Sequence, residues 1–275
     1  MSFVEEARWF QAPPAQDPSA PVAPGHVTLV GAGPGDPELL TVRALRALQG
    51  ARMVLYDHLV SREVLQYVDP AAELVYVGKQ SSQHTLPQES IIDLMLRLAR
   101  SGRSLVRLKG GDCFIFGRGG EEVLALAEHG IPYDVVPGIT AAQAAGACAG
   151  IALTHREHAG TLVLATGHLC GRDEVALDWQ ALARPRQTLV IYMGIATLAL
   201  ICRELQAHGL PGGTPAALVE RASLAQQRCV TGTLAGLPAL AQQHDVRAPA
   251  LIVIGEVVAL QPQILRGMAV PAQAG

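Results

Sequence analysis

The sequence predicts an α/β protein made of two domains. Three observations support this prediction. Short apolar segments alternate with amphipathic ones along the first half of the 275-residue chain. Two glycine-rich turns, at residues 31–37 and 110–120, each follow an apolar segment, as ligand-binding turns do at strand ends in α/β sheets. Small side chains then dominate residues 138–150, and we place the junction between the domains there.

The elements of the first half follow from hydrophobic periodicity and capping signals. Buried strands are predicted at residues 26–30, 53–56, 74–77, 104–108 and 133–136. Helices are predicted at residues 37–49, 87–100 and 121–128. Asp36 and Pro37 suit the N-cap and first position of the first helix, and Gly50 suits its end. This alternation implies a largely parallel sheet that is covered on both faces.

The second half is also predicted to be α/β, with more antiparallel pairing. Its strands are expected at residues 161–165, 188–192, 216–220, 228–233 and 250–256, and its helices around 195–209 and 234–244. The predicted organisation is therefore a flexible Pro- and Ala-rich extension over residues 1–24, an N-terminal domain over 25–137, a C-terminal domain over 138–260 and a tail over 261–275.

Composition and charge argue against several classes of protein. The formal net charge of −3 gives no general basic surface, so no nucleic-acid partner is expected. No apolar run reaches the roughly 20 residues of a membrane helix, so no membrane partner is expected. The five cysteines are odd in number and form no CxxC pair, which favours reduced thiols in the cytoplasm over disulfides or a zinc cluster. The first residues lack the apolar core of a secretory signal.

The first glycine turn, Gly31-Ala32-Gly33-Pro34-Gly35-Asp36, invites a dinucleotide-binding interpretation, which we disfavour. Asp36 stands in place of the third Rossmann glycine, and its carboxylate would repel a pyrophosphate at that helix start. Pro34 also removes one backbone N–H donor. The turn better suits a neutral or cationic ligand, and a tight turn that needs glycine for conformation alone is the alternative.

The second turn gathers charges of both signs. Asp112 is suited to attract a cationic ligand or to accept a hydrogen bond from it, although an ordinary turn aspartate is also plausible. Arg107, Lys109 and Arg118 are suited to bind carboxylates, and the alternative is structural pairing with the glutamates at 121 and 122. Carboxylates and guanidinium groups at one cleft suit a cationic cofactor beside a polyanionic substrate.

Seven motifs stand in order along the chain: Gly31-Ala32-Gly33-Pro34-Gly35-Asp36-Pro37, Tyr56-Asp57, Gly78-Lys79, the stretch 110–122, Pro137-Gly138-Ile139-Thr140-Ala141-Ala142, Leu153-Thr154-His155-Arg156 and Tyr192-Met193-Gly194. By this ordered set the chain resembles the tetrapyrrole methylase family over residues 25–260, and within it the members that C-methylate uroporphyrinogen III. The resemblance implies two α/β domains with a cofactor cleft between them, and a homodimer.

The resemblance also implies a reaction. S-adenosylmethionine would methylate two pyrrole carbons of uroporphyrinogen III, giving precorrin-2 by way of precorrin-1 and releasing S-adenosylhomocysteine. No metal is needed, because the sulfonium is already an activated methyl donor. The chain ends without an attached dehydrogenase or chelatase domain, so a single-function enzyme is expected.

Site residues are carried over by motif. The cofactor contacts implied are Pro34, Gly110, Gly111, Asp112, Ile115, Thr140, Ala141 and Met193, with Ala222 and Ala250 aligned less securely. Asp57 and Lys79 match positions with acid–base roles in the family, and Arg107 is a candidate to shuttle a proton. The alternatives are a turn residue for Asp57 and an ordinary surface lysine for Lys79. Three arginines are expected to meet the eight substrate carboxylates: Arg107, Arg118 and Arg156.

One residue departs from the pattern of the family. Cys113 stands where relatives usually carry proline after Gly-Gly-Asp, and we interpret it as a tolerated small apolar residue, with a reactive thiol as the alternative.

His155 and His158 suggest a metal pair, but a zinc site needs more ligands, and none stands at suitable spacing, so no metal is expected.

Three other functions remain open at this stage. One is a methyltransferase acting on a later corrin intermediate, and another is a nicotinamide-dependent oxidoreductase that uses the first glycine turn. The third is a non-catalytic tetrapyrrole-binding module, which would retain the substrate without turnover. The residues do not tell whether the product enters cobalamin, sirohaem or haem d1 biosynthesis.

Overall fold

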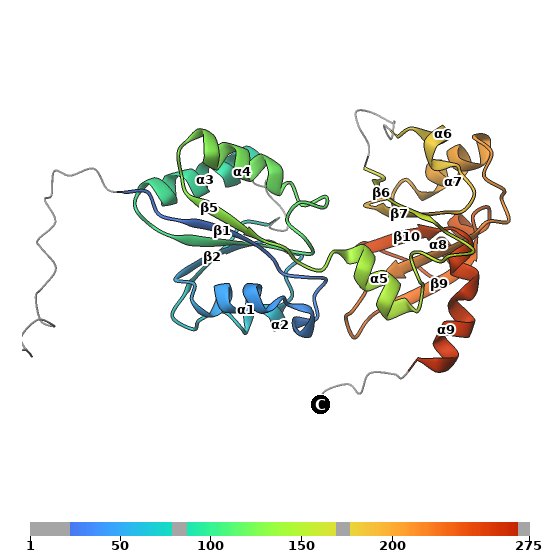
Figure 1. The fold of residues 1–275 in the computed structure, drawn as a ribbon, viewed down its shortest axis with the longest axis horizontal. Helices are drawn as coiled ribbons and strands as arrows, with labels where there is room; N and C mark the ends of the chain where they lie inside the picture. The colour runs from blue at the N-terminus through green and yellow to red at the C-terminus, as the bar shows by residue number, and fades with distance from the viewer. Residues whose placement is uncertain (1–22, 79–86, 169–176, 269–275) are drawn as a thin grey trace, which may run out of the picture.

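The computed structural model describes residues 23–78, 87–168 and 177–268, which form two sheets joined at α5 (Ala141–Ala149) (Figure 1). The first sheet has the strand order β3-β2-β4-β1-β5 and all its pairs are parallel. Its strands are β1 (Val27–Gly31), β2 (Met53–Tyr56), β3 (Glu73–Tyr76), β4 (Leu105–Lys109) and β5 (Tyr133–Val136). The predicted parallel sheet is therefore confirmed.

Helices cover both faces of the first sheet. One face carries α1 (Val42–Gln49) and α2 (Arg62–Leu65), and the other carries α3 (Gln88–Arg100) and α4 (Gly119–Glu128) (Figure 1). Each face buries its own apolar cluster, one around Leu48 and Val54 and the other around Met95 and Leu55. Burial on both faces explains why these strands are nearly continuous apolar runs.

The second sheet has the order β6-β7-β10-β8-β9. Its strands are β6 (Thr161–Thr166), β7 (Gln187–Tyr192), β8 (Pro215–Glu220), β9 (Arg228–Thr233) and β10 (Ala250–Ile254). Only β6 and β7 pair in parallel, so the expected antiparallel character of this half is confirmed. One face packs against α6 (Trp179–Leu182), α7 (Leu198–Ala207) and α8 (Leu237–Gln243).

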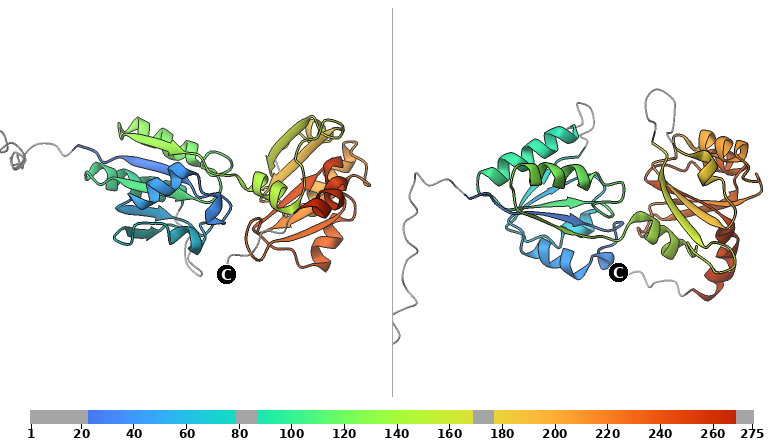
Figure 2. Two further views of the ribbon diagram at one scale, coloured as in Figure 1. Left: turned by 60° about the horizontal axis from the view of Figure 1, so that its bottom comes forward. Right: turned by 45° about the horizontal axis from the view of Figure 1, so that its top comes forward.

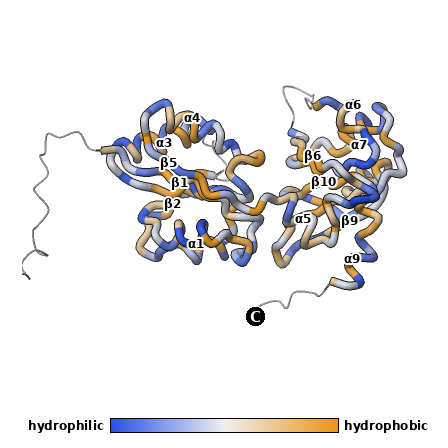
Figure 3. Tube along the Cα trace, in the orientation of Figure 1, coloured by the Kyte–Doolittle hydropathy of each residue, from blue (hydrophilic) through white to orange (hydrophobic). Residues whose placement is uncertain are grey.

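The other face of the second sheet is covered by α5 and by a 3-10 segment, η2 (Glu256–Leu260). The small residues of α5 let it lie close to its neighbours: a Cβ at Gly146 would come within 2.9 Å of the Ile151 carbonyl oxygen. In both views of Figure 2 the chain crosses from one sheet to the other just before α5. Figure 3 shows the hydrophobic colours running along the strands inside each half.

Three of the differences from the prediction concern the first helix, the burial of β3 and the residues after 260. The first helix is broken into a 3-10 turn, η1 (Pro37–Leu39), and α1, because Leu40 is extended and Thr41 caps α1 by accepting from the Ala44 N–H at 3.1 Å. The strand β3 is only partly buried, since it lies at the sheet edge. Part of the predicted tail forms α9 (Gln261–Gly267), because the buried Gln261 donates to the Ala149 carbonyl at 2.7 Å.

Two expected absences concern the described residues. None of the helices in the described ranges is long and apolar enough to cross a membrane. Within those same ranges Cys113, Cys148, Cys202 and Cys229 are free thiols, and Cys170 lies outside them.

Candidate functional site

The two glycine turns predicted to share a site meet at the carboxyl edge of the first sheet. Strand β1 lies between β4 and β5 and is parallel to both, so the loops after these strands leave the sheet side by side. Gly33 and Gly111 form a small bridge, with the Gly111 N–H donating to the Gly33 carbonyl at 2.7 Å and the Gly33 N–H donating to the Gly111 carbonyl at 3.1 Å. The structure therefore brings the two turns together.

The third loop is packed equally closely. A Cβ on Gly138 would lie 2.2 Å from the Gly111 carbonyl oxygen, which no side chain tolerates, and Gly111 itself has φ +69°. These glycines are required for contact between loops as well as for any approach to a ligand. The structure therefore supports the conformational interpretation of the turns and leaves a ligand role as a prediction.

Asp112 connects these loops through its carboxylate. Its Oδ1 accepts from the Phe114 N–H at 2.8 Å and the Ile115 N–H at 3.1 Å, and its Oδ2 accepts from the Gly138 N–H at 3.1 Å. The turn role considered for Asp112 is thus present. Its predicted contact with a cofactor stays a prediction, and a variant of Asp112 will disturb the loops as well as any ligand.

The corresponding edge of the second sheet carries the remaining predicted contacts. Met193 follows β7 and Ala222 follows β8, while Ala250 begins the antiparallel β10 between them. The two edges touch, because the Asp36 N–H donates to the Ser223 hydroxyl at 3.3 Å. Met193 is 54% exposed, so the core-packing alternative for this residue is wrong. A cofactor cleft at this junction stays a prediction.

Backbone strain concentrates in the same loops. Five of the seven described non-glycine residues with positive φ follow β4, β7 or β8: Phe116, Arg118, Met193, Arg221 and Ser223. Such conformations cost free energy and are retained where the surrounding structure enforces them, often at binding sites. No sequence pattern predicted this strain, because these residues are not glycine or asparagine.

Tyr192 is a residue of this region that the sequence analysis quoted in a motif without giving it a role. Its buried hydroxyl lies 2.7 Å from Thr140 Oγ1 and accepts from the Ala142 N–H at 2.9 Å. The ring of Phe116 lies 4.7 Å from the Tyr192 ring, centroid to centroid. Ile115 packs against the apolar cluster of the second half. The junction is therefore held by side chains from both halves.

Below the loop after β4 lies a buried charge cluster. Glu122 is fully buried, and its Oε1 accepts from Arg107 Nε at 3.2 Å, Lys109 Nζ at 2.9 Å and Gln88 Nε2 at 3.1 Å. Its Oε2 has no hydrogen-bond partner among the described residues. Burial, helped by the neighbouring Arg107 cation, lowers the pKa of Lys109, while Glu122 opposes this shift. Arg107 Nη2 completes the cluster at 3.2 Å from Asp57 Oδ2.

This cluster bears on the prediction for Arg107. Arg107 is only 3% exposed and donates to Asp57, Glu122 and backbone carbonyls, and its predicted roles in substrate binding and proton transfer stay predictions. The structural pairing considered as the alternative is what the structure shows. Asp57 also accepts from the Leu59 N–H at 3.1 Å as a turn residue, yet its side chain stays 20% exposed. Lys79 lies outside the described residues.

The other two predicted substrate arginines remain accessible. Arg118 directly precedes α4, is 55% exposed at its side chain, and pairs with Glu121 through contacts of 2.7 and 2.8 Å. Arg156 is exposed in the loop that follows α5. Both can turn toward a polyanion, but no described contact places them at a common site.

The histidine pair acquires a third neighbour in the structure. Ligand atoms of His155, Glu157 and His158 lie within 4.8 Å of one another, and Glu157 was not predicted to join the pair. The Glu157 N–H donates to His155 Nδ1 at 3.2 Å, and His158 Nδ1 lies 3.2 Å from Glu256 Oε2. These contacts already use one nitrogen of each ring, and the expectation of no metal stays a prediction.

Cys113 behaves as a small apolar residue. It is fully buried, and desolvation raises the pKa of its thiol to about 12. A thiol held protonated in this way is a poor nucleophile. Its backbone carbonyl accepts from the Gly119 N–H at 3.0 Å, so the residue helps to close the loop.

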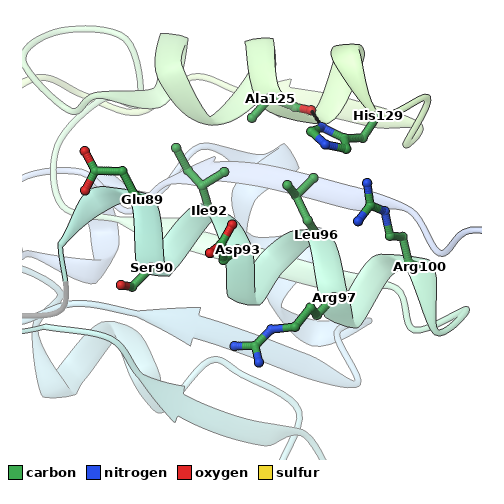
Figure 4. Close-up of a pocket in the computed structure, with 9 residues that line it drawn as sticks. All are labelled: Glu89, Ser90, Ile92, Asp93, Leu96, Arg97, Arg100, Ala125 and His129. Carbon is green, nitrogen blue, oxygen red and sulfur yellow. Dashed lines mark hydrogen bonds between the residues drawn. The ribbon is translucent and has the colours of Figure 1, made fainter.

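A separate groove of about 660 Å³ lies between α3 and α4 (Figure 4). It is lined by Glu89, Ser90, Ile92, Asp93, Leu96, Arg97, Arg100, Ala125 and His129. Its charges are mixed in sign, and none of the predicted site residues lines it. We therefore place the candidate site at the junction of the two sheets and not in this groove.

Comparison with solved structures gives the same fold. The chain is similar to the uroporphyrin-III C-methyl transferase of Thermus thermophilus, with 44% identity, a TM-score of 0.74, and coverage of 86% of this chain and 94% of that one. The same enzyme complexed with S-adenyl homocysteine matches with a TM-score of 0.73. A cobalt precorrin-4 methyltransferase has 28% identity and a TM-score of 0.75, covering 85% of this chain and 95% of that chain.

Curated relatives are longer. The siroheme synthases of Methylobacillus flagellatus and Pseudomonas aeruginosa are 55% and 54% identical over 87% and 89% of this chain. The chain spans about half the length of these relatives, 51% and 52%. The family model described as Tetrapyrrole (Corrin/Porphyrin) Methylases matches residues 26–238. With its two-sheet fold and its glycine loops at the junction, the chain belongs to the tetrapyrrole methylases.

Proposed function

We propose that the chain transfers methyl groups from S-adenosylmethionine to two pyrrole carbons of uroporphyrinogen III, giving precorrin-2 through precorrin-1. The observation that carries this proposal is the 44% identity with the Thermus enzyme over 94% of that enzyme's chain. The crystal structure of that enzyme with S-adenyl homocysteine supports the choice of cofactor. Family membership favours methyl transfer over the nicotinamide-dependent alternative.

The junction suits a sulfonium cofactor. Backbone groups of the loops after β1, β4 and β5 converge there, and the exposed Met193 offers an apolar, polarizable contact for an adenosyl group. S-adenosylmethionine brings an activated methyl group, so the protein supplies orientation and electrostatics. Alignment of the methyl donor with the pyrrole carbon contributes at most about 7–11 kcal/mol.

The proton that leaves the methylated macrocycle needs an acceptor. Asp57 is the described candidate, because its carboxylate is partly exposed while Arg107 Nη2, at 3.2 Å, fixes its orientation. Arg107 thereby acts through Asp57. Lys79 is proposed as a second acid–base group on the strength of its motif. Arg118 and Arg156 are the accessible cations proposed for the substrate carboxylates.

The proposal is tested by incubating the chain with uroporphyrinogen III and methyl-labelled S-adenosylmethionine. Two labelled methyl groups on the macrocycle are expected, with a monomethylated species preceding the final product. Incubation with later corrin intermediates is the matched control. Labelling of a later intermediate and not of uroporphyrinogen III would select the other methyltransferase function. Stabilisation by nicotinamide cofactors and not by S-adenosylhomocysteine in a thermal shift would contradict both.

Two further properties belong to this proposal. We also propose a homodimer, which light scattering after size exclusion will test. The cytoplasmic location expected from the sequence stays a prediction.

A further inference from the structure

Tyr192 lies where the segments of the candidate site converge. It ends β7 and is 8% exposed. Its hydroxyl contacts Thr140 Oγ1 at 2.7 Å and the Ala142 N–H at 2.9 Å, in the first turn of α5. Its ring contacts Phe116, in the loop after β4. The following residue is Met193, which has φ +54°. One side chain thus joins three segments that are far apart in the sequence.

Each of these segments carries predicted cofactor contacts. The loop after β4 contains Gly110 to Asp112 and Ile115, the first turn of α5 contains Thr140 and Ala141, and the turn after β7 contains Met193. A ligand held by all three segments binds well only when their relative positions are fixed. Among the described contacts, those of Tyr192 reach all three.

We propose that Tyr192 is a positioning residue for the cofactor, whose hydroxyl fixes the first turn of α5 and whose ring fixes the loop after β4. This inference rests on the proposed function, because it takes the predicted cofactor contacts as the ones that bind. Tyr192 acts through its neighbours and needs no contact with the reacting atoms.

The hydrogen-bonding arrangement explains why a tyrosine is needed. The first N–H groups of a helix lack partners within the helix, and the Ala142 N–H is one of them. The Tyr192 oxygen accepts from it and still has a proton or a lone pair for Thr140. Burial raises the pKa of Tyr192, so the hydroxyl keeps its proton at neutral pH. A phenylalanine would preserve the ring contact with Phe116 and lose both hydrogen bonds.

The test is the affinity of Tyr192→Phe for S-adenosylhomocysteine, measured by titration calorimetry. We expect the Kd to rise at least tenfold, with a similar rise in the KM for S-adenosylmethionine and a fall of less than threefold in kcat. The matched control is Thr188→Val, which removes a buried hydroxyl from the same strand and should change the Kd less than twofold. A Kd for Tyr192→Phe within twofold of the parent protein overturns the proposal.

A double-mutant cycle separates coupling from independent effects. Thr140→Val removes the same bond from its other end, so adding it to Tyr192→Phe should raise the Kd by less than the product of the two single effects. Multiplicative effects overturn the proposal. If Tyr192→Phe does not fold, Phe116→Ala, which removes the ring contact from its other end, should raise the Kd at least fivefold, and an unchanged Kd overturns the proposal. A parent protein that binds no adenosyl compound refutes the proposed function instead.

Discussion

The two halves of the molecule share a layout and differ in how they bury polar groups. Each half has a five-stranded sheet with helices on both faces. In the first half, Arg107, Lys109 and Glu122 are all buried together beneath the glycine loops. In the second half, the buried Glu220 pairs with Arg228, whose side chain is 48% exposed, and with Arg221 nearby.

This difference separates two ways of fixing a site. A buried ion cluster in which each member needs the others holds β4, α4 and Asp57 in one geometry, at a large cost in desolvation. The second half bears a smaller cost, because the Arg228 partner of Glu220 stays half exposed, and its loops contain the strained Met193 turn and the hydroxyl contact of Tyr192. The rigid charge cluster is therefore expected to dominate stability, and the hydroxyl contacts are expected to dominate ligand affinity.

Loss of Glu122 should have the largest effect on stability. Glu122→Ala leaves the buried Arg107 and Lys109 without their carboxylate, so we expect unfolding free energy to fall by about 3–5 kcal/mol. Glu220→Ala should cost less, because Arg228 can turn to solvent. Glu121→Ala, one position away but exposed and paired with Arg118, should cost at most about 1 kcal/mol. Urea denaturation of the three variants measures this order, and equal losses would contradict the contrast.

In the second sheet, removal of a buried polar group should raise the unfolding free energy instead of lowering it. Thr188 is fully buried, and its hydroxyl has no partner among the described residues. Thr188→Val removes this unsatisfied group while keeping the shape, so we expect unfolding free energy to rise by about 1 kcal/mol. Denaturant unfolding checks the sign. A loss of stability would mean that the hydroxyl has a partner, and it would weaken the contrast between the two sheets.

Much of the fold was predictable because its signals are local. Strands buried on both faces are continuous apolar runs, and the helix caps are readable: Asp36 accepts from the Glu38 N–H at 2.9 Å as expected of an N-cap. The break between η1 and α1 was less predictable. Leu40 has an extended backbone that ends the first turn, and nothing in its residue type requires this. Thr41 is a second N-cap, whose side chain accepts from the Ala44 N–H, and α1 begins after Thr41 and not after Asp36.

The loops of the candidate site were predicted, but the ion pairs of its side chains were not. Glycine marks close backbone approach, so the meeting of the turns at Gly33 and Gly111 followed from their position after parallel strands. The burial of Arg107 did not follow, since alternation along β4 tells which side chains share a face but not what covers that face. The partner Glu122 was predicted only as one alternative, because the sequence does not distinguish it from Glu121, which is exposed.

Hydroxyl contacts were missed for a different reason. The bond between Tyr192 and Thr140 joins residues 52 positions apart, and no periodicity or capping rule links them. The only local signal was the place of Tyr192 directly before Met193 in a motif. Long-range contacts between side chains of separate elements depend on how those elements are placed, which a single sequence does not encode locally.

The smallest expected difference between the halves is in the pH dependence of stability that their buried thiols cause at alkaline pH. Burial raises the pKa of Cys113 to about 12 and that of Cys202 to about 11, so the unfolded chain loses these protons first. Their contribution to stability is complete below about pH 8.5 and is lost as pH rises through the folded-state values, by up to about 1.4 kcal/mol per unit for each thiol. The lowered pKa of Lys109 acts in the opposite direction. Cys113→Ala and Cys202→Ala should each flatten the decline of unfolding free energy above pH 9, whatever their offset at pH 7. Since the Cys113 thiol titrates later, its variant should keep the advantage to higher pH, and a slope unchanged by Cys113→Ala would show that this thiol ionises in the folded protein.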